Sequence, residues 1–550
     1  MYLFLLVFLS FSQAYAAYTE LSPQEINDIE KRLEDFYSPK LDTQVMNRPT
    51  VKYDVFTSRP AQPNSFLSKN NNTSTNLLVQ QAGAKSSTRF QKNYCEKFLK
   101  KYFPKIQCPT EKPQNWSTFH QNDHLKDLTR TWVEPNFELD MVPTRGEIMH
   151  DAWSDDYWRT KWGQTSYRYA INQFNPMKYS EAIRSSDPIG EWTNFRLTLP
   201  EEVSKKVLFW SPSEKYDLTV GDSQFSLTQQ QKDEGKNYVN EEGDVEGWMG
   251  LCHGWAPAAL MTARPMKPVT AKSANNVDVT WYPNDIKAMV TLAWANGTYQ
   301  NNFIGGRCNV KNPETLRNGR LKQQECFDTN PATFHLALGN MIGRARIGLV
   351  YDKSFDFEVW NQPIISYETT YFNPLRPQSK SKDWREVAVR YDWRFKRQDR
   401  FQTPLSRGRT TAQSPSYDDS RIEYIVGAIT TVVYLAEIRP DHTDQVQEDR
   451  AYRETYTYDL EVEEVGGKLM ASGGEWHENS HPDFLWVPQK DAIPSSDYDN
   501  ESLSVDLGTA PTSILTETAQ LSSRYGNPLC RVIKSLIKES TGTDSYQCPQ

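Results

Sequence analysis

One stretch constrains this chain more than any other, residues 247–260 with the sequence GWMGLCHGWAPAAL. Cys252 stands behind a glycine-rich turn and ahead of a run of small apolar residues, a pattern that predicts a buried helix beginning at the thiol. A helix N-terminus has unpaired N–H groups and a partial positive charge, which favour a thiolate and can hold an oxyanion. The stretch therefore predicts a nucleophilic cysteine. The alternative is a structural thiol, buried as a small apolar residue or held in a disulfide.

The number and spacing of the cysteines favour the nucleophile. Of the seven cysteines, six form three pairs close in sequence, and Cys252 is left over. The three pairs are Cys95 with Cys108, Cys308 with Cys326, and Cys530 with Cys548. In an exported protein an odd cysteine is either an intermolecular bridge or a free reactive thiol.

The N-terminus predicts export. Residues 3–12 are an apolar run of signal-peptide length, and the triplet Ala-Tyr-Ala at 14–16 fits a cleavage site. We therefore expect a signal peptide over 1–16 and a secreted protein, extracellular or periplasmic. The next longest apolar stretch, 424–438, is rich in β-branched residues and too short to cross a bilayer, so it predicts a buried strand and no membrane span in the mature chain.

The remaining chain divides by composition. Residues 17–87 contain an amphipathic helical pattern followed by a polar stretch, which predicts a pro-region and linker, or else a leader with no inhibitory role. We expect a catalytic region over 88–490 and a disulfide-tied C-terminal tail over 491–550. The net charge of −8, without a dense Lys/Arg stripe, argues against a nucleic-acid partner.

A second stretch with candidate catalytic residues follows Cys252. His335 lies inside an apolar run, and the segment 346–352 has the pattern of a buried strand that ends in Asp352, 17 residues after the histidine. A cysteine on a helix, then a histidine, then a carboxylate is the order of papain-like and transglutaminase-type cysteine enzymes. We predict Cys252 as nucleophile, His335 as base and Asp352 as the group that orients it. Asp356 competes for the third role, and a lone histidine of this kind is often a core residue.

The C-terminal half predicts an antiparallel sheet behind these residues. The sequence from 384 to 464 has strand-like patterns, and Gly466-Gly467 predicts a hairpin turn. The expected fold class is α+β, an elaborated papain/transglutaminase-like cysteine enzyme core with an antiparallel sheet.

Four stretches follow one another along the chain as possible family motifs: the cysteine segment 250–259, the histidine segment 330–335, the pentapeptide VWNQP at 359–363 and the segment 473–486. In this order they resemble the transglutaminase elicitor family of secreted enzymes. The resemblance covers about residues 240–490. The residues after the pentapeptide differ from the form that plants recognise in the oomycete members, so that recognition does not carry over. His253 stands where papain and animal transglutaminases have an aromatic residue, and His481 is a second candidate base.

The resemblance implies a transglutaminase, which forms a Cys252 thioester with a glutamine side chain and transfers the acyl group to a lysine amine. The partners would be proteins with exposed Gln and Lys, and Trp248, Trp255 and Trp360 could wall the site against water. No cofactor is required. Ca²⁺ is possible at the carboxylates within 140–156, although a solvated acidic face fits their spacing better. The alternatives are a papain-like cysteine protease or deamidase, and a catalytically inactive surface-binding or elicitor protein.

Overall fold

The computed structural model of the protein describes residues 123–170, 210–240, 245–314, 321, 326, 329–402, 421–442, 449–477, 481–499 and 502–549. The predicted signal peptide, the pro-region and the pair Cys95 and Cys108 lie outside the described residues. The segment 88–122 at the start of the predicted catalytic region lies outside them too.

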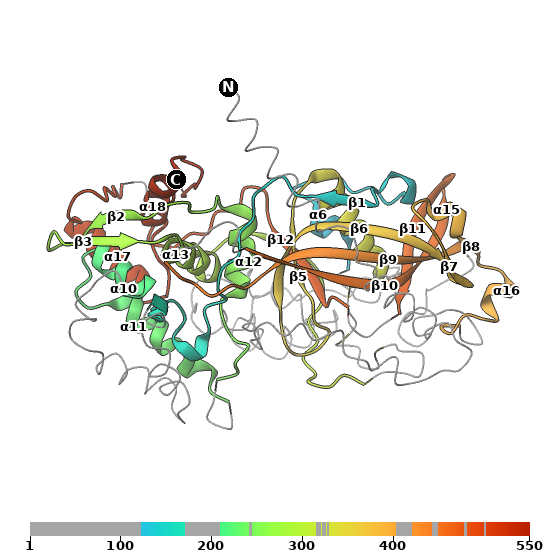
Figure 1. Ribbon diagram of the computed structural model, residues 1–550, viewed down its shortest axis with the longest axis horizontal. Coiled ribbons are helices and arrows are strands. Elements are labelled where there is room, and N and C mark those ends of the chain that lie inside the picture. The colour runs from blue at the N-terminus through green and yellow to red at the C-terminus, as the bar shows by residue number, and fades with distance from the viewer. Residues whose placement is uncertain are drawn as a thin grey trace, which may run out of the picture.

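A large antiparallel sheet dominates one end of the molecule (Figure 1). Its main path runs β11-β10-β9-β6-β5-β12-β4, and three further strands, β1, β7 and β8, pair with its members. The strands are β1 (Arg145–Glu147), β4 (Asn301–Gly305), β5 (Leu349–Asp352), β6 (Asn361–Asn373), β7 (Arg376–Ser381), β8 (Val389–Arg390), β9 (Ile422–Ala436), β10 (Arg450–Val465), β11 (Lys468–Trp476) and β12 (Phe484–Pro488).

The longest strands form where the sequence predicts them. β9 covers nearly all of the β-branched run at 424–438 and is buried along most of its length. β10 and β11 form a hairpin around Gly466 and Gly467, whose φ angles of 61° and 80° lie in the left-handed region. A two-residue turn of this kind needs positive φ at both positions, which glycine adopts without strain.

Helices and a small two-stranded sheet form the other end (Figure 1). The small sheet pairs β2 (Val269–Lys272) with β3 (Asp278–Trp281). The helices of this end are α10 (Pro212–Thr219), α11 (Ser226–Asp233), α13 (Pro283–Asn296), α17 (Ser513–Ser523) and α18 (Cys530–Thr541). α12 (Cys252–Met261) lies between this end and the large sheet.

Short helices cover the large sheet or pack among the helices of the other end. They are α6 (Leu125–Thr129), η5 (Leu139–Met141), η6 (Thr160–Trp162), η7 (Gln164–Ser166), η10 (Glu234–Tyr238), α14 (Pro331–Ala337), α15 (Trp384–Val387) and α16 (Trp393–Lys396). α14 continues directly into η12 (Leu338–Ala345), which is a π-helix. Together these elements give an α+β fold with an antiparallel sheet, as expected.

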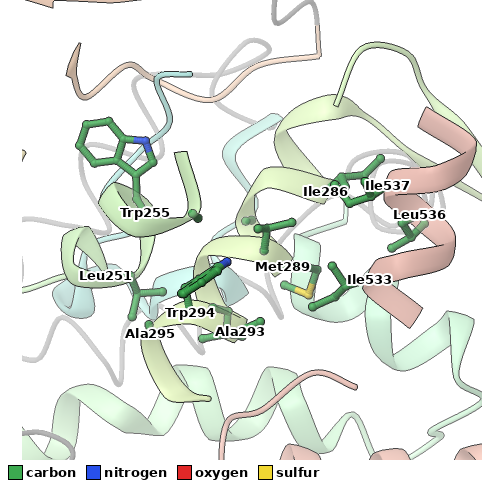
Figure 2. Packing of buried hydrophobic residues seen from close by; sticks show 14 of the residues in the cluster. Leu251, Trp255, Ile286, Met289, Ala293, Trp294, Ala295, Ile533, Leu536 and Ile537 are labelled. Atoms are coloured by element: carbon green, nitrogen blue, oxygen red, sulfur yellow. The ribbon is translucent and has the colours of Figure 1, made fainter. Parts of the chain in front are cut away.

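The C-terminal tail packs into the same core as the cysteine helix. Ile533 and Ile537 of α18 belong to one buried apolar cluster with Met289 of α13 and Trp255 of α12 (Figure 2). The predicted disulfides Cys308–Cys326 and Cys530–Cys548 are both formed. The second of them ties the end of the tail to the first turn of α18.

The solvated acidic face expected over 140–156 forms only in part, because Asp140, Glu147 and Asp151 are exposed whereas the last two carboxyl groups are not. Asp155 and Asp156 are both buried. The Asp155 carboxylate accepts hydrogen bonds from Trp158 Nε1, at 3.0 Å, and Thr291 Oγ1, at 3.2 Å. Burial raises the pKa of Asp155 to about 8. Because Thr291 belongs to α13, its hydrogen bond to Asp155 joins this segment to that helix. In the described part of the chain, no helix is both long and apolar enough to cross a membrane.

Candidate active site around Cys252

Cys252 is the first residue of α12, as the sequence predicts, and its thiol is free. The preceding residue, Leu251, donates its N–H to Tyr157 O at 2.5 Å, which fixes the loop ahead of the helix. Gly254 lets α12 lie close against α13, because a Cβ at this position would be 2.2 Å from Thr291 O. The helix start, and with it the sulfur, is therefore held firmly between the two halves of the molecule.

A chain of hydrogen bonds from the large sheet reaches the sulfur. Asn361, the first residue of β6, donates its Nδ2–H to Cys252 Sγ at 3.5 Å. Trp486 of β12 donates its Nε1–H to Asn361 Oδ1 at 2.9 Å, and this bond fixes which end of the amide faces the sulfur. A donor aimed at the sulfur stabilises a thiolate more than a thiol.

The thiol is nevertheless neutral in this structure at neutral pH. Cys252 is 0% exposed, and burial raises the pKa of its thiol to about 12. The hydrogen bond from Asn361 lowers this pKa, whereas the nearby charges of Glu437 and Asp352 raise it. A reaction at Cys252 therefore requires a base that takes its proton as the sulfur attacks.

Asp352 is a buried carboxyl in the neighbourhood of the thiol. It ends β5 directly opposite Asn361 in the β5–β6 register. Its Oδ1 accepts hydrogen bonds from Trp360 N at 2.7 Å and from Ser354 Oγ at 2.9 Å. Burial raises its pKa to about 7, and these hydrogen bonds and the charge of Arg307 limit the rise. A carboxyl with this pKa exists in both protonation states near neutral pH, as proton transfer requires.

The structure does not bring His335 to Cys252. His335 lies in α14, where its Nδ1 is 2.9 Å from Tyr458 OH and its Nε2 is 3.0 Å from Tyr371 OH. Tyr371 lies ten residues after Asn361 on β6, which is about 30 Å along an extended strand. The prediction that His335 acts as the base for Cys252 does not fit this geometry, since both of its ring nitrogens are bonded to core tyrosines. Burial lowers the pKa of His335 to about 4, as expected for a core histidine.

The two alternatives from the sequence lie elsewhere. Asp356 is half-buried in the loop after β5, where its Oδ1 accepts a hydrogen bond from Glu358 N at 3.0 Å. The His481 ring stacks on Trp476 at 5.1 Å and lies 6.0 Å from the ring of Phe355, in the same loop as Asp356. His481 is therefore in contact with the loop that leaves Asp352, and its role as a base stays a prediction.

The three tryptophans have different surroundings. Trp255 is buried in the apolar core and donates its Nε1–H to Trp153 O, so it packs the helix. Trp248 is buried against Phe357 at 5.8 Å, which joins the loop before Cys252 to the loop after β5. Trp360 is partly exposed, and Lys353 Nζ lies 5.2 Å from the centre of its ring. Trp248 and Trp360 remain candidates for a wall of the site.

Only the structure shows that Asn361 bonds the thiol of Cys252. The sequence draws attention to the VWNQP segment only as a family signature, yet Val359, Asn361 and Gln362 are all buried. Gln362 donates its Nε2–H to Glu437 Oε1 at 2.7 Å, while Asn361 bonds the thiol. Consecutive residues of the signature thus hold the nucleophile and a carboxylate near it.

Metal ligands form no cluster in the residues described: no group of three or more His, Cys, Asp or Glu side chains there is arranged to hold an ion. A Ca²⁺ requirement, which the sequence leaves open, therefore has no defined site among these residues.

The fold and this site define an α+β protein built around a buried, free cysteine on a helix N-terminus. The family model described as "Transglutaminase elicitor" matches residues 126–498, and the chain belongs to this family. Among solved structures, the chain is similar to the GP42 transglutaminase from Phytophthora sojae, with a TM-score of 0.46 and 19% sequence identity over 75% of this chain and 99% of that chain. No curated protein matches it.

Proposed function

We propose that this protein is a secreted protein-glutamine γ-glutamyltransferase. The observation that carries the proposal is Cys252 at the N-terminus of α12, with the Asn361 amide on its sulfur and the Asp352 carboxyl nearby. Membership of the transglutaminase elicitor family supports it. A nucleophile at a helix start that faces an antiparallel sheet also fits the papain/transglutaminase-like core expected from the sequence.

The first half of the reaction acylates the thiol. Cys252 Sγ attacks the γ-carboxamide carbon of a glutamine while Asp352 takes the thiol proton, and the Cys252 N–H donates to the developing oxyanion. The C–N bond then breaks, and the proton held by Asp352 goes to the leaving nitrogen, so that ammonia departs and a thioester remains.

The second half transfers the acyl group to an amine. A neutral lysine ε-amine attacks the thioester carbon, Asp352 takes a proton from the attacking nitrogen, and the C–S bond breaks. The sulfur recovers the proton, which restores the thiol and the carboxylate and leaves an isopeptide bond. In this scheme Asp352 is the base, and His335 has a structural role among Tyr371 and Tyr458.

The test is the incorporation of a fluorescent primary amine into a glutamine-rich protein, with Cys252→Ala as control. Incorporation by the unaltered chain and none by Cys252→Ala is the expected result. Cleavage of the protein substrate, or ammonia release without amine incorporation, that depends on Cys252 would instead indicate a protease or a deamidase. Parallel reactions with Ca²⁺ and with a chelator test whether the activity depends on Ca²⁺.

A catalytically inactive elicitor protein is the second candidate, and one observation favours it. The thiol is fully buried with a pKa raised to about 12, and His335 is far from it. This candidate predicts no Cys252-dependent reaction with amine or water under any of the conditions above.

Secretion forms part of the proposal. The two disulfides are typical of proteins of oxidising compartments, and they support the export predicted from residues 1–16. Removal of the N-terminal segment from the protein recovered outside the cell, read by mass spectrometry, is the expected result. Retention of residues 1–16 would contradict it.

A further inference from the structure

Arg307 is a buried cation that the reaction above does not use. It follows β4, and it is 3% exposed. The next residue, Cys308, is held twice, by its disulfide to Cys326 and by its N–H, which donates to Asp483 Oδ2 at 2.8 Å. The backbone that carries Arg307 is therefore fixed by a covalent bridge and by a buried carboxylate.

The guanidinium of Arg307 has hydrogen-bonding capacity to spare. Its Nη2 donates to Phe357 O, in the loop after β5. Within the described residues, its Nε and Nη1 are buried and donate no hydrogen bond. A buried N–H group without a hydrogen-bond partner lowers the free energy of unfolding, and an arginine has five N–H groups in a fixed planar arrangement.

Asp352 has an acceptor oxygen that complements these donors. Its Oδ1 accepts hydrogen bonds from Ser354 and Trp360, whereas its Oδ2 is buried and, among the residues described, accepts none. Burial lowers the pKa of Arg307, and the charges of Asp352, Asp483 and Asp356 oppose this, while the charge of Arg307 lowers the pKa of Asp352. The charge of Asp352 raises the pKa of the Cys252 thiol. The same loop links the groups, because Phe357 accepts the Arg307 hydrogen bond and packs on Trp248 in the loop before Cys252. Among the residues described, two donor nitrogens of Arg307 and one acceptor oxygen of Asp352 thus have no partner.

A primary carboxamide can bond both groups, because its carbonyl oxygen accepts from the Arg307 N–H groups and its N–H donates to Asp352 Oδ2. We propose that Arg307 and Asp352 form the subsite for the γ-carboxamide of the glutamine donor. The Arg307 N–H groups bind its carbonyl oxygen, and Asp352 Oδ2 accepts one of its amide N–H bonds. This inference rests on the proposed transglutaminase function and names the group that its site recognises.

The subsite gives a reason for preference of glutamine over glutamate. A glutamate carboxylate has no N–H to donate to Asp352, and its charge opposes that of an ionised Asp352. A site that accepts a hydrogen bond from a substrate N–H strongly rejects an analogue without that N–H, because the buried acceptor in the site is left unpaired. The same groups would bind the tetrahedral intermediate, so Arg307 acts as a positioning residue that also contacts the reacting carbonyl.

The experiment measures alkylation of Cys252 by small probes, read as intact mass. The probes are 2-chloroacetamide, its N,N-dimethyl derivative, which lacks the N–H, and methyl methanethiosulfonate, which has no amide. Each rate is divided by the rate of the same probe with free cysteine. The variants are Arg307→Met and Arg307→Lys. Lys311→Met is the matched control, because Lys311 is an exposed cation 5.3 Å from the centre of the Phe357 ring.

We expect the unaltered chain to prefer chloroacetamide over the dimethyl derivative by about tenfold, the effect of one hydrogen bond. Arg307→Met should slow both amides by about tenfold and leave the methanethiosulfonate rate unchanged, and Arg307→Lys should recover part of the loss. Lys311→Met should behave as the unaltered chain. Equal effects of Arg307→Met on all three probes, no preference for the primary amide, or no reaction of the native thiol with chloroacetamide would each overturn the proposal.

Amine incorporation then separates this inference from the proposed function. Cys252-dependent incorporation with an unchanged KM for the glutamine donor in Arg307→Met would refute the subsite and leave the transglutaminase. Arg307-dependent preference for chloroacetamide, with no incorporation of amine by any variant, would refute the transglutaminase and leave a carboxamide-binding site.

Discussion

Replacement of Asp352 by asparagine should stabilise the protein more at alkaline than at acidic pH. Asp352 is 0% exposed, and burial is the main cause that raises its pKa from 3.8 to about 7. The folded chain therefore binds the Asp352 proton more tightly than the unfolded chain does. The stabilising contribution of this proton is complete below the unfolded pKa and is lost as the pH rises through the folded pKa. Asparagine does not titrate, so the variant lacks this loss.

The size of the effect follows from the two pKa values. Keeping Asp352 in the folded chain costs about 2 kcal/mol at about pH 5 and about 4 kcal/mol at about pH 8.5, relative to a group that never ionises. The free energy of unfolding of the unaltered chain should therefore fall by about 2–3 kcal/mol more than that of Asp352→Asn between these pH values. All groups that titrate alike in both chains cancel in this difference.

Urea unfolding of both chains at the two pH values measures the difference. Asp356→Asn is the control, because that carboxyl is only half-buried and lies in the adjacent loop. A pH dependence shared by the unaltered chain and Asp352→Asn would refute the buried, high-pKa carboxyl, and with it the reason for assigning the base to Asp352. The same variant should lose amine incorporation, which would show a site residue that is kept at the expense of stability.

Three further substitutions, one of them with a matched glycine control, test the site. Asn361→Ala removes the N–H on the sulfur and should slow alkylation of Cys252 by about tenfold at a fixed pH, with a pH–rate profile shifted upward; an unshifted profile would contradict this. Gly254→Ala places a Cβ 2.2 Å from the backbone of α13 and should lower the free energy of unfolding by about 1–3 kcal/mol in thermal or urea unfolding. Gly247→Ala, with open space around the new Cβ, should change it by less than about 0.5 kcal/mol. His335→Gln should lower the melting temperature and leave the alkylation rate of Cys252 within about twofold, since His335 bonds core tyrosines; a large fall in that rate would restore His335 as the base.

Features set by local pattern could be predicted from the sequence. The start of α12 at Cys252, the strand β9 and the glycine hairpin between β10 and β11 each depend on neighbours in sequence. The disulfides Cys308–Cys326 and Cys530–Cys548 close short loops, so proximity along the chain was enough to pair them. A buried strand that ends in Asp352 could also be predicted, because this is itself a local pattern, whereas the predicted role of Asp352 in orienting His335 does not fit the hydrogen bonds of that histidine.

The placement of His335 could not be predicted in this way. The spacing of 17 residues to Asp352 allows the histidine to lie on either side of the sheet or at either end of a strand. In the structure α14 packs against β10 and β11 and runs on into the π-helix η12, and this path takes His335 to the far end of β6.

Asn361 and Arg307 were missed for the opposite reason. Asn361 bonds a sulfur 109 residues earlier in the chain, and Arg307 bonds the carbonyl of Phe357, 50 residues later. Neither residue type signals a site by itself. Asn361 is set opposite Asp352 by the β5–β6 pairing, and Arg307 follows β4, which reaches β5 through β12. The VWNQP signature was the one available signal for Asn361.

The packing of α18 on α13 has a consequence for the order in which this protein matures. The chain is made from its N-terminus, and the apolar side chains that complete the packing around α12 and α13 include Ile533 and Ile537, close to the C-terminus. Until these residues emerge from the ribosome, the helix that carries Cys252 lacks part of its supporting layer. We therefore expect a growing or prematurely ended chain to hold its thiol in an unfinished setting until these residues, far downstream of Cys252, have been made.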